Sequence, residues 1–185
     1  SRILLEKHDI KTPTTSFHAW SDQHKLEQLL EHLEDGKNIA LISDAGTPGI
    51  SDPGYVLIKA ALARNIQVVP IPGPSAFLAA LSASGVATHQ FLYLGFLPIK
   101  KGRQTLLKSL KEEKRTIVFY ESPHRLLKTL HELDTVFADR QVVIARELTK
   151  IHEEFFRSTA KDAYMYFSAN KSPKGEFVIM MAGCN

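Results

Sequence analysis

Apolar residues in the first half of the chain follow two patterns, a helical spacing and short uninterrupted runs. The clearest helical stripe has leucines at i, i+3, i+4 and i+7, and Gly36 can end that helix. Two apolar runs, 38–43 and 66–71, are typical of buried strands. Four helices are predicted in this half. The first runs from Arg2 to about His8, and the second contains Leu26, Leu29, Leu30 and Leu33, with Ser21 or Asp22 as its cap. The third runs from Pro53, with Asp52 as its cap, to about Arg64, and the fourth from Ser75 to near Gly85.

The second half repeats this alternation of strands and helices. Because strands alternate with helices of ordinary length, we expect α/β layers around a mostly parallel sheet. Such a unit usually opens on a strand, whereas this chain opens on a helix, so we expect a leading strand and its loop to be missing. Strands are predicted over 91–96, 116–120, 141–146, 153–157 and 176–182, and helices over 103–113, 123–133 and 160–167.

Composition is that of a globular protein, since 44% of the 185 residues are hydrophobic and 23% are charged. No apolar run approaches the ~20 residues of a membrane-spanning helix, and no secretory leader opens the chain, so we expect no membrane partner. The single cysteine, Cys184, excludes an internal disulfide and suits a reducing cytoplasm. The scattered histidines lack metal-ligand spacing, so no metal site is expected.

Charge is unevenly distributed along the chain. Residues 1–90 have a net charge of −2 and residues 91–185 a net charge of +5. The sign changes near 85–89, which is therefore the predicted boundary between a domain 1–88 and a domain 89–185. The basic half can face a polyanion. A basic stretch from Lys100 to Arg115, which includes Arg103, could touch phosphates, although a solvated helix face also explains it.

Two turn-rich loops follow the predicted strands of the first domain. The loop "DAGTPGISDPG" (44–54) is long for a strand-to-helix connection, and its glycines permit positive φ and close approach of a ligand. "PGPS" (72–75) repeats the arrangement; taken alone, a turn followed by a helix cap explains it better, but two such loops at one sheet edge favour a ligand site. In an open α/β sheet, both loops would lie at the edge where ligands bind. Neither loop has the pattern of a phosphate loop or a dinucleotide fingerprint.

Acidic and basic side chains gather at two predicted strand ends of the second domain. "FYESPHR" (119–125) combines Glu121 with Arg125, and "ARELT" (145–149) combines Arg146 with Glu147. A cluster of an acid and a guanidinium at a strand end is typical of a site, whereas a surface ion pair explains Arg146 and Glu147 about as well. We take Glu121 and Glu147 as candidate bases, and Arg125 and Arg146 as candidate phosphate contacts.

Five ordered motifs, "DAGTPGISDPG", "PIPGPSA", "GFLP", "FYESPHR" and "ARELTK", closely resemble the small-subunit rRNA (cytidine-2′-O-)-methyltransferases of the tetrapyrrole methylase superfamily. The resemblance covers essentially the whole chain. It implies an α/β fold of two α/β/α lobes with S-adenosylmethionine in the cleft between them, and methylation of a cytidine ribose in the decoding region of 16S rRNA. It also implies a homodimer. The family begins with a strand and a Pro-Ile-Gly-Asn loop that this sequence does not contain.

The resemblance assigns cofactor contacts to both lobes. The residues it implies are Asp44, Ala45, Gly46, Thr47, Pro48, Pro72, Gly73 and Ser75 in the first part of the chain, and Tyr120, Ser122 and Leu148 in the second. The +5 charge of the second half favours RNA over a small tetrapyrrole as the substrate. Three alternatives stay open: a relative that methylates another substrate, a non-catalytic ribosome- or cofactor-binding module, and an α/β domain for another nucleotide.

Overall fold

The computed structural model describes residues 2–18, 23–169 and 173–184. The predicted caps Ser21 and Asp22 lie outside the described residues. The chain divides into two compact units, Ser1–Pro74 and Ser75–Asn185.

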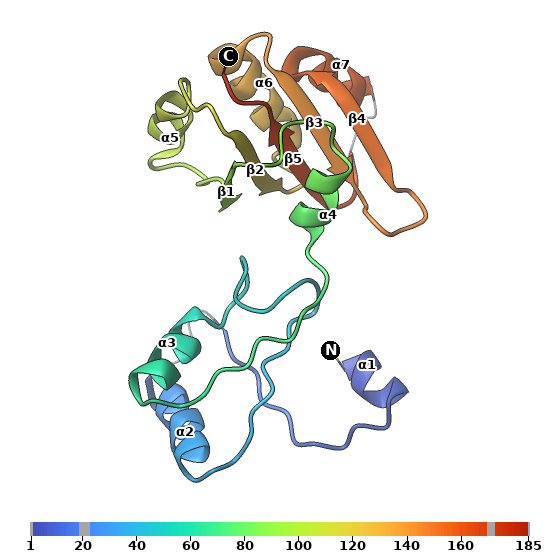
Figure 1. Cartoon of the computed structure of the whole chain (residues 1–185). Helices are drawn as coiled ribbons and strands as arrows, with labels where there is room; N and C mark the ends of the chain where they lie inside the picture. Colours follow the sequence, from blue (N-terminus) through green and yellow to red (C-terminus); the bar gives the residue numbers. More distant parts are fainter. Residues whose placement is uncertain (1, 19–22, 170–172, 185) are drawn as a thin grey trace. The chain divides into compact units, whose positions relative to one another are not determined.

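The first unit is built of helices and loops (Figure 1). Its helices are α1 (Arg2–Lys7), α2 (Gln23–Glu34) and α3 (Tyr55–Ala63). The leucine stripe of α2 packs on α3 and forms a small core of Leu26, Leu29, Leu30, Leu57 and Ala61. Helix α3 begins at Tyr55 instead of Pro53, and its N-cap is Gly54 with a φ of 147°. The predicted cap Asp52 therefore lies in the preceding turn.

The two strands predicted in the first unit, 38–43 and 66–71, are wrong. Both runs are loops in the structure. A strand is held by hydrogen bonds to a neighbouring strand, and neither run has such a neighbour in the described part of the chain. Their apolar side chains are consequently left in solvent, with Ile42 51%, Val69 62% and Ile71 79% exposed. An apolar run alone is therefore not sufficient to form a strand here.

The second unit contains a five-stranded sheet with the order β1-β2-β5-β3-β4. The strand β1 pairs parallel with β2, whereas the pairs β2–β5, β5–β3 and β3–β4 are antiparallel. The expectation of a mostly parallel sheet is therefore wrong, because the last strand inserts between β2 and β3 and runs against both. The strands are β1 (Phe91–Phe96), β2 (Thr116–Glu121), β3 (Gln141–Arg146), β4 (Glu154–Thr159) and β5 (Phe177–Met181).

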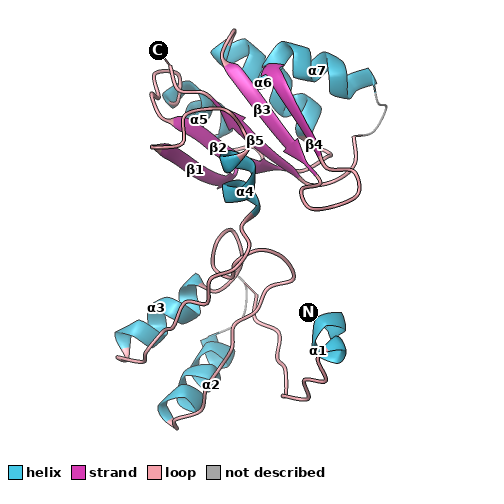
Figure 2. Ribbon diagram, turned by 45° about the vertical axis from the view of Figure 1, so that its right-hand side comes forward, coloured by secondary structure: helices cyan, strands magenta, loops and turns pink. Residues whose placement is uncertain are grey.

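Helices cover both faces of this sheet (Figure 2). One face packs on α4 (Ala76–Ser82) through a cluster that includes Val118, Val143 and Met180. The opposite face packs on α5 (Arg103–Ser109), α6 (Leu126–Phe137) and α7 (Ala160–Ala169) through a larger cluster around Phe119 and Ile144. Neighbouring residues of each strand therefore face different layers, as the pleat of a strand requires.

The bounds of α5 and α6 differ from the prediction. Helix α5 ends at Ser109 and does not extend to Glu113. Helix α6 begins at Leu126, because the Ser122 carbonyl accepts hydrogen bonds from the backbone N–H groups of Arg125 and Leu126 and closes a turn first. Pro123 consequently lies in that turn, before the helix.

The second compact unit begins at Ser75, ahead of the predicted domain boundary at 85–89. Helix α4 belongs to it because Ala80 and Leu81 are buried against the sheet. The domains 1–88 and 89–185 stay a prediction about how the chain folds. Among the described residues, no helix combines the length and the apolar character that crossing a membrane requires.

Candidate functional site

The carboxyl ends of three strands lie at one edge of the sheet. Strands β1 and β2 are parallel, and both β2 and β3 run against β5, so β1, β2 and β3 point the same way. Their last residues are Phe96, Glu121 and Arg146. The fold therefore brings "GFLP", "FYESPHR" and "ARELT" together at this edge, as expected of loops that follow strands of one direction.

The Glu121 carboxylate is fully enclosed at this edge, with none of its side chain exposed. Its Oε1 accepts a hydrogen bond from the backbone N–H of Ser122 at 2.8 Å and forms an ion pair with Arg125 Nη2 at 2.7 Å. Its Oε2 accepts from Thr129 Oγ1 at 2.6 Å and lies 3.7 Å from Arg103 Nη2. Both carboxylate oxygens are thus engaged by groups of the protein, which is the arrangement a buried charge requires.

The two arginines beside Glu121 connect it to the loop after β1. Arg125 Nη1 donates to the Leu97 carbonyl at 3.0 Å, and Arg103 Nη1 donates to the Pro98 carbonyl at 3.1 Å. Arg103 also pairs with Glu132, Nε to Oε2 at 2.7 Å. This Glu121 network, made of Arg103, Glu121, Arg125, Thr129 and Glu132, therefore joins the ends of β1 and β2 to α5 and α6.

The surroundings of these side chains favour a structural role over the predicted ones. A general base needs an accessible oxygen within reach of the proton that it removes. The Glu121 carboxylate offers no exposed surface. The guanidinium of Arg125, predicted as a phosphate contact, is held by Glu121 and by the Leu97 carbonyl. Arg103, placed in a phosphate-binding stretch by sequence, is 3% exposed, so that part of the prediction is wrong.

Glu147, the second candidate base, lies just beyond β3 and is partly accessible, with 20% of its side chain exposed. Its Oε1 accepts hydrogen bonds from Lys150 Nζ at 2.9 Å and from the Glu176 backbone N–H at 3.0 Å. The bond from Lys150, followed by that from the Glu176 backbone, lowers the pKa of the Glu147 carboxyl. Gly175 makes room for this side chain, since a Cβ there would lie 2.5 Å from Glu147 Cγ.

Arg146 also has partners within the protein. Its Nε donates to the Lys174 carbonyl at 2.7 Å, and its Nη1 pairs with Glu154 Oε2 at 3.2 Å. The side chain is 22% exposed. Part of the guanidinium is thus committed to holding the segment before β5, and the predicted phosphate contact stays a prediction.

Among the expected cofactor residues of the second unit, Tyr120, Leu148 and Ser75 lie on the side of the sheet where α4 packs. The Tyr120 hydroxyl accepts a hydrogen bond from the Phe77 backbone N–H at 3.3 Å, which leaves its own proton able to donate. Ser75 is the N-cap residue of α4, but its hydroxyl does not cap the helix. Leu148 packs against the same apolar cluster as Tyr120. Ser122 closes the turn before α6.

Two loops carry the expected cofactor residues of the first unit, and a hydrogen bond joins them. Thr47 Oγ1 donates to the Pro74 carbonyl at 2.9 Å. Gly46 has a φ of +69°, and a Cβ at this position would meet nothing within 4 Å. Its backbone is therefore open to a ligand. The expected residues in these loops are Asp44, Ala45, Gly46, Thr47, Pro48, Pro72 and Gly73.

These loops offer polar groups that can bind a ligand with amine and hydroxyl groups. Asp44 contributes an exposed carboxylate, and the neighbouring residues contribute backbone groups. Such groups suit the amino and ribose hydroxyl groups of S-adenosylmethionine, so the residues present fit that cofactor.

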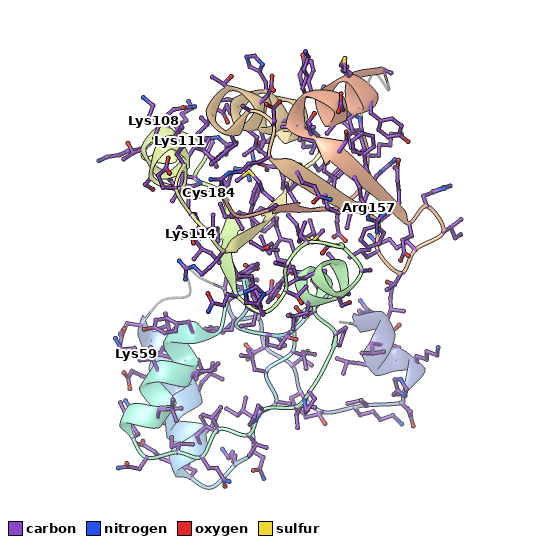
Figure 3. All side chains as sticks on the ribbon, turned by 45° about the horizontal axis from the view of Figure 1, so that its top comes forward. Lys59, Lys108, Lys111, Lys114, Arg157 and Cys184 are labelled. Carbon is purple, nitrogen blue, oxygen red and sulfur yellow. The ribbon has the colours of Figure 1, made fainter. Side chains whose placement is uncertain are left out.

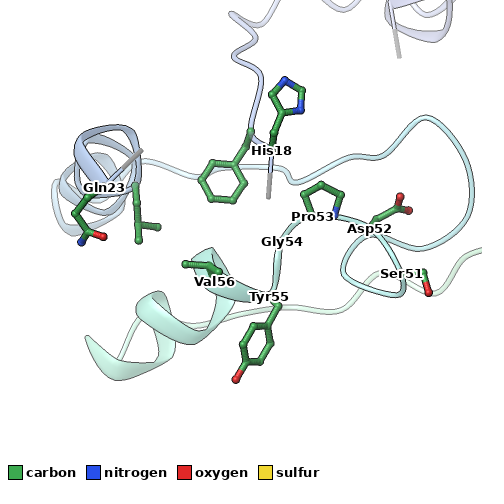
Figure 4. A pocket seen from close by; sticks show the side chains of 10 residues that line it. His18, Gln23, Ser51, Asp52, Pro53, Gly54, Tyr55 and Val56 are labelled. Carbon is green, nitrogen blue, oxygen red and sulfur yellow. The ribbon is translucent and has the colours of Figure 1, made fainter. Parts of the chain in front are cut away.

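A pocket of about 350 Å³ lies elsewhere in the first unit (Figure 4). It is lined by the second part of the 44–54 loop, including Asp52 and Gly54, and by His18 and Gln23. It does not include Asp44–Pro48. The predicted ligand loop thus contributes Thr47 to the contact with Pro74 and residues 51–54 to this pocket.

Sequence reasoning missed most of the Glu121 network, although the pattern contains a signal for it. Arg103 occupies the i position of a stripe with Leu106, Leu107 and Leu110 in and after α5. Thr129 similarly lies on the buried stripe of α6. Glu121 falls at every second position after Ile117 and Phe119 in β2, on the same buried face. A polar residue on an apolar stripe is expected to be buried and paired with another such residue.

Comparison with known proteins places these features in one family. A family model for Tetrapyrrole (Corrin/Porphyrin) Methylases matches residues 2–164. The chain is 51% identical over 182 residues to "Ribosomal RNA small subunit methyltransferase I" of Synechocystis sp., a match that covers 97% of this chain and 65% of that protein. It is 45% identical over 181 residues to the protein of the same name from Thermotoga maritima, covering 98% and 81%. The chain therefore spans slightly less than two thirds of the Synechocystis relative.

Solved structures share the fold at low sequence identity. Diphthine synthase matches with a TM-score of 0.71 and 12% identity, over 98% of this chain and 74% of that one. Uroporphyrin-III C-methyl transferase from Thermus thermophilus, complexed with S-adenosyl homocysteine, matches with a TM-score of 0.57 and 16% identity, over 86% and 73%. The chain belongs to the tetrapyrrole (corrin/porphyrin) methylase family, and the two relatives from Synechocystis sp. and Thermotoga maritima within it are named ribosomal RNA small subunit methyltransferase I.

Proposed function

We propose that the protein to which this chain belongs transfers a methyl group from S-adenosylmethionine to the 2′-hydroxyl of a cytidine in 16S rRNA. The observation that carries the proposal is the 45–51% identity to two ribosomal RNA small subunit methyltransferases I. The complex of a structural neighbour with S-adenosyl homocysteine supports the choice of cofactor. The first-unit loops, joined by Thr47 and Pro74, have groups that suit it.

The residues proposed to hold the cofactor are those of the 44–48 and 72–75 loops, together with Tyr120, Ser122 and Leu148. When bound, S-adenosylmethionine would supply an electrophilic methyl group on a sulfonium. The Tyr120 hydroxyl, whose oxygen is fixed by the Phe77 N–H, is an oriented donor for such a ligand. Methyl transfer is an in-line displacement, and orienting the ribose hydroxyl can lower its barrier by ~7–11 kcal/mol.

Of the two candidate bases, we retain Glu147 for removal of the hydroxyl proton and assign Glu121 to positioning. Glu147 is partly exposed, whereas Glu121 is enclosed. Because the Lys150 ammonium lowers the pKa of Glu147, it is a weak base, and its contribution belongs at the low end of the usual range, ~10²-fold. Glu121 instead fixes the turn that carries Ser122 through the Ser122 N–H.

The proposed partners follow from the same relatives. The substrate is 16S rRNA or the small ribosomal subunit, and the protein acts as a homodimer in the cytoplasm. The net charge of +5 on residues 91–185 supports a polyanionic partner, since phosphate binding draws on such charge. Size-exclusion chromatography with light scattering tests the dimer, which a monomeric mass would contradict.

Methyl transfer to isolated small ribosomal subunits tests the proposed function. Subunits without the modification are incubated with the protein and S-adenosylmethionine labelled in its methyl group, and the rRNA is digested to nucleosides. We expect label in 2′-O-methylcytidine. Label in a base, in a ribosomal protein or in an added porphyrinoid would favour a relative with another substrate. Binding to subunits without transfer would favour a non-catalytic module.

A Glu147→Gln variant separates the role of this carboxylate from binding. We expect the transfer rate to fall by ~10²-fold while the affinity for S-adenosylmethionine is unchanged, because only the proton acceptor is removed. A rate close to that of the unaltered protein would place the base elsewhere.

A further inference from the structure

Five lysines follow one another through the segment that contains α5, and the proposed chemistry leaves them without a role. Lys100 and Lys101 come directly after the loop that leaves β1, and Lys108, Lys111 and Lys114 lie on α5 and the turn before β2. All five are exposed. Within residues 2–18, 23–169 and 173–184, none of them forms an ion pair. We name this set the α5 lysine track.

The basic residues of the same segment outside the track are already neutralised. Arg103 is buried with Glu121 and Glu132. Arg115 pairs with Glu113, Nη2 to Oε2 at 2.8 Å, and this arginine lowers the pKa of Glu113 to about 2. Glu112 is the one remaining acidic residue of 100–115. The track therefore retains most of its positive charge.

The track runs between the two edges of the sheet. Lys100 and Lys101 follow the carboxyl end of β1, at the edge that carries the Glu121 network, whereas Lys114 precedes the first residue of β2, at the opposite edge. A strand of six residues such as β2 spans ~20 Å. At ~3.4 Å per phosphate of a stacked strand, this distance corresponds to about six phosphates.

The position of three of these lysines is visible in Figure 3, where Lys108 and Lys111 lie close together at α5 and Lys114 lies further along. The turn that holds them is fixed by the protein. The Lys111 carbonyl accepts a hydrogen bond from Arg140 Nη2, and the Cys184 backbone N–H donates to the Glu113 carbonyl at 2.8 Å. The chain enters β2 two residues after Lys114, so the track ends there.

We infer that the α5 lysine track binds the phosphate backbone of the RNA substrate and leads the strand to the site edge. This inference rests on the proposed function. Lysine is a compact charge on a flexible stem, so it neutralises phosphates without reading sequence. A row of exposed lysines along this segment offers successive positive charges to the phosphates of a single strand. The track thus contributes affinity, while the choice of the cytidine belongs to the site.

The test compares two triple variants that lose the same charge. Lys108→Gln/Lys111→Gln/Lys114→Gln removes part of the track, and Lys59→Gln/Lys128→Gln/Lys161→Gln removes three exposed lysines elsewhere. Affinity for a fluorescein-labelled single-stranded RNA and for small ribosomal subunits is measured by fluorescence polarisation and sedimentation over a range of salt concentrations. Thermal unfolding and S-adenosylmethionine affinity are recorded for each protein.

On a single strand, each lysine–phosphate contact contributes ~0.7 to the slope of log affinity against log salt concentration. Removing three contacts therefore makes this slope shallower by ~2. At 0.1 M salt this corresponds to a loss of ~100-fold relative to the unaltered protein, which disappears near 1 M. The control triple variant should change the slope by less than a third of the change expected for the track variant. A Lys108→Arg/Lys111→Arg/Lys114→Arg variant should retain both slope and affinity.

Each other outcome overturns a defined part of the inference. Equal losses in the two triple variants would mean that overall charge, and not the track, governs binding. Unchanged RNA affinity in the track variant would exclude RNA as its partner and leave an acidic protein surface as the alternative, with the proposed methyl transfer intact. No RNA binding by the unaltered protein at any salt concentration would overturn the inference together with the proposed substrate.

Discussion

Replacing Glu121 by glutamine tests whether this carboxylate is a structural anchor. The change keeps the size of the side chain but removes a charge that is fully buried between Arg125 at 2.7 Å and Arg103 at 3.7 Å. Removing one partner of a buried pair typically costs ~3–5 kcal/mol, because the other charge stays uncompensated. Arg103 keeps Glu132, and Arg125 is 23% exposed, so we expect the lower end, ~3 kcal/mol.

The loss is measured as a change in thermal unfolding. For a unit of this size, ~3 kcal/mol lowers Tm by ~10 °C. Far-UV circular dichroism is the appropriate signal, because all the described strands lie in the second unit and residues 75–185 contain no tryptophan. Glu112→Gln, at an exposed position, is the matched control and should change stability by less than ~0.5 kcal/mol.

A double-mutant cycle with Arg103→Gln assigns the loss to the network. Residues that share one ion-pair network show coupling of ~0.5–3 kcal/mol, so the double variant should be more stable than the sum of the single losses implies. Unchanged stability of Glu121→Gln together with loss of methyl transfer would refute the structural role. That result would restore Glu121 as the candidate base.

Three further predictions concern other parts of the chain. Arg115 lowers the pKa of Glu113 to about 2, so their ion pair is fully present above the ordinary carboxyl pKa and is lost as pH falls through the lowered value. The NMR resonance of the Arg115 side-chain N–H should therefore titrate near pH 2, and a midpoint near 4.5 would contradict the pairing. Gly54→Ala should destabilise the first unit by ~1–3 kcal/mol in urea unfolding, since φ is +147° and the new Cβ would lie 2.8 Å from Leu41 Cδ2; an unchanged midpoint would exclude this close approach. Tyr120→Phe should weaken S-adenosylmethionine binding about fivefold by calorimetry if its hydroxyl is a ligand donor, and equal affinities would remove it from the site.

Elements of the second unit could largely be predicted from the sequence. The strands 91–96 and 141–146 have the predicted bounds, because their apolar runs end at turn residues and each has a neighbour to pair with. Strand direction could not be predicted. A run such as 177–181 is buried on both faces whichever way it points, so its apolar pattern is the same in a parallel or an antiparallel sheet.

The runs 38–43 and 66–71 show the limit of local pattern in the first unit. Their composition predicts strands, but strand formation depends on a hydrogen-bonding neighbour that local composition does not identify. The site shows the same limit in another form. The motifs around Glu121 and Arg125 correctly indicate a cluster at a strand end, whereas burial decides what that cluster does. Glu121 is buried because α5 and α6 cover this end of the strand. The partners that these helices supply, Arg103 and Thr129, lie on segments distant from the motif in sequence.

Titration calorimetry with S-adenosylmethionine tests most directly whether the 44–48 and 72–75 loops belong to a cofactor site. The protein is compared with Thr47→Val, which keeps the shape of the side chain but removes the hydrogen bond to the Pro74 carbonyl, and with Thr105→Val at an exposed position of α5 as control. Loss of one such bond costs ~1 kcal/mol in loop order, so we expect saturable binding that Thr47→Val weakens about fivefold and Thr105→Val leaves unchanged. Absence of saturable heat with the unaltered protein, or equal affinity in all three, would contradict a cofactor site at these loops.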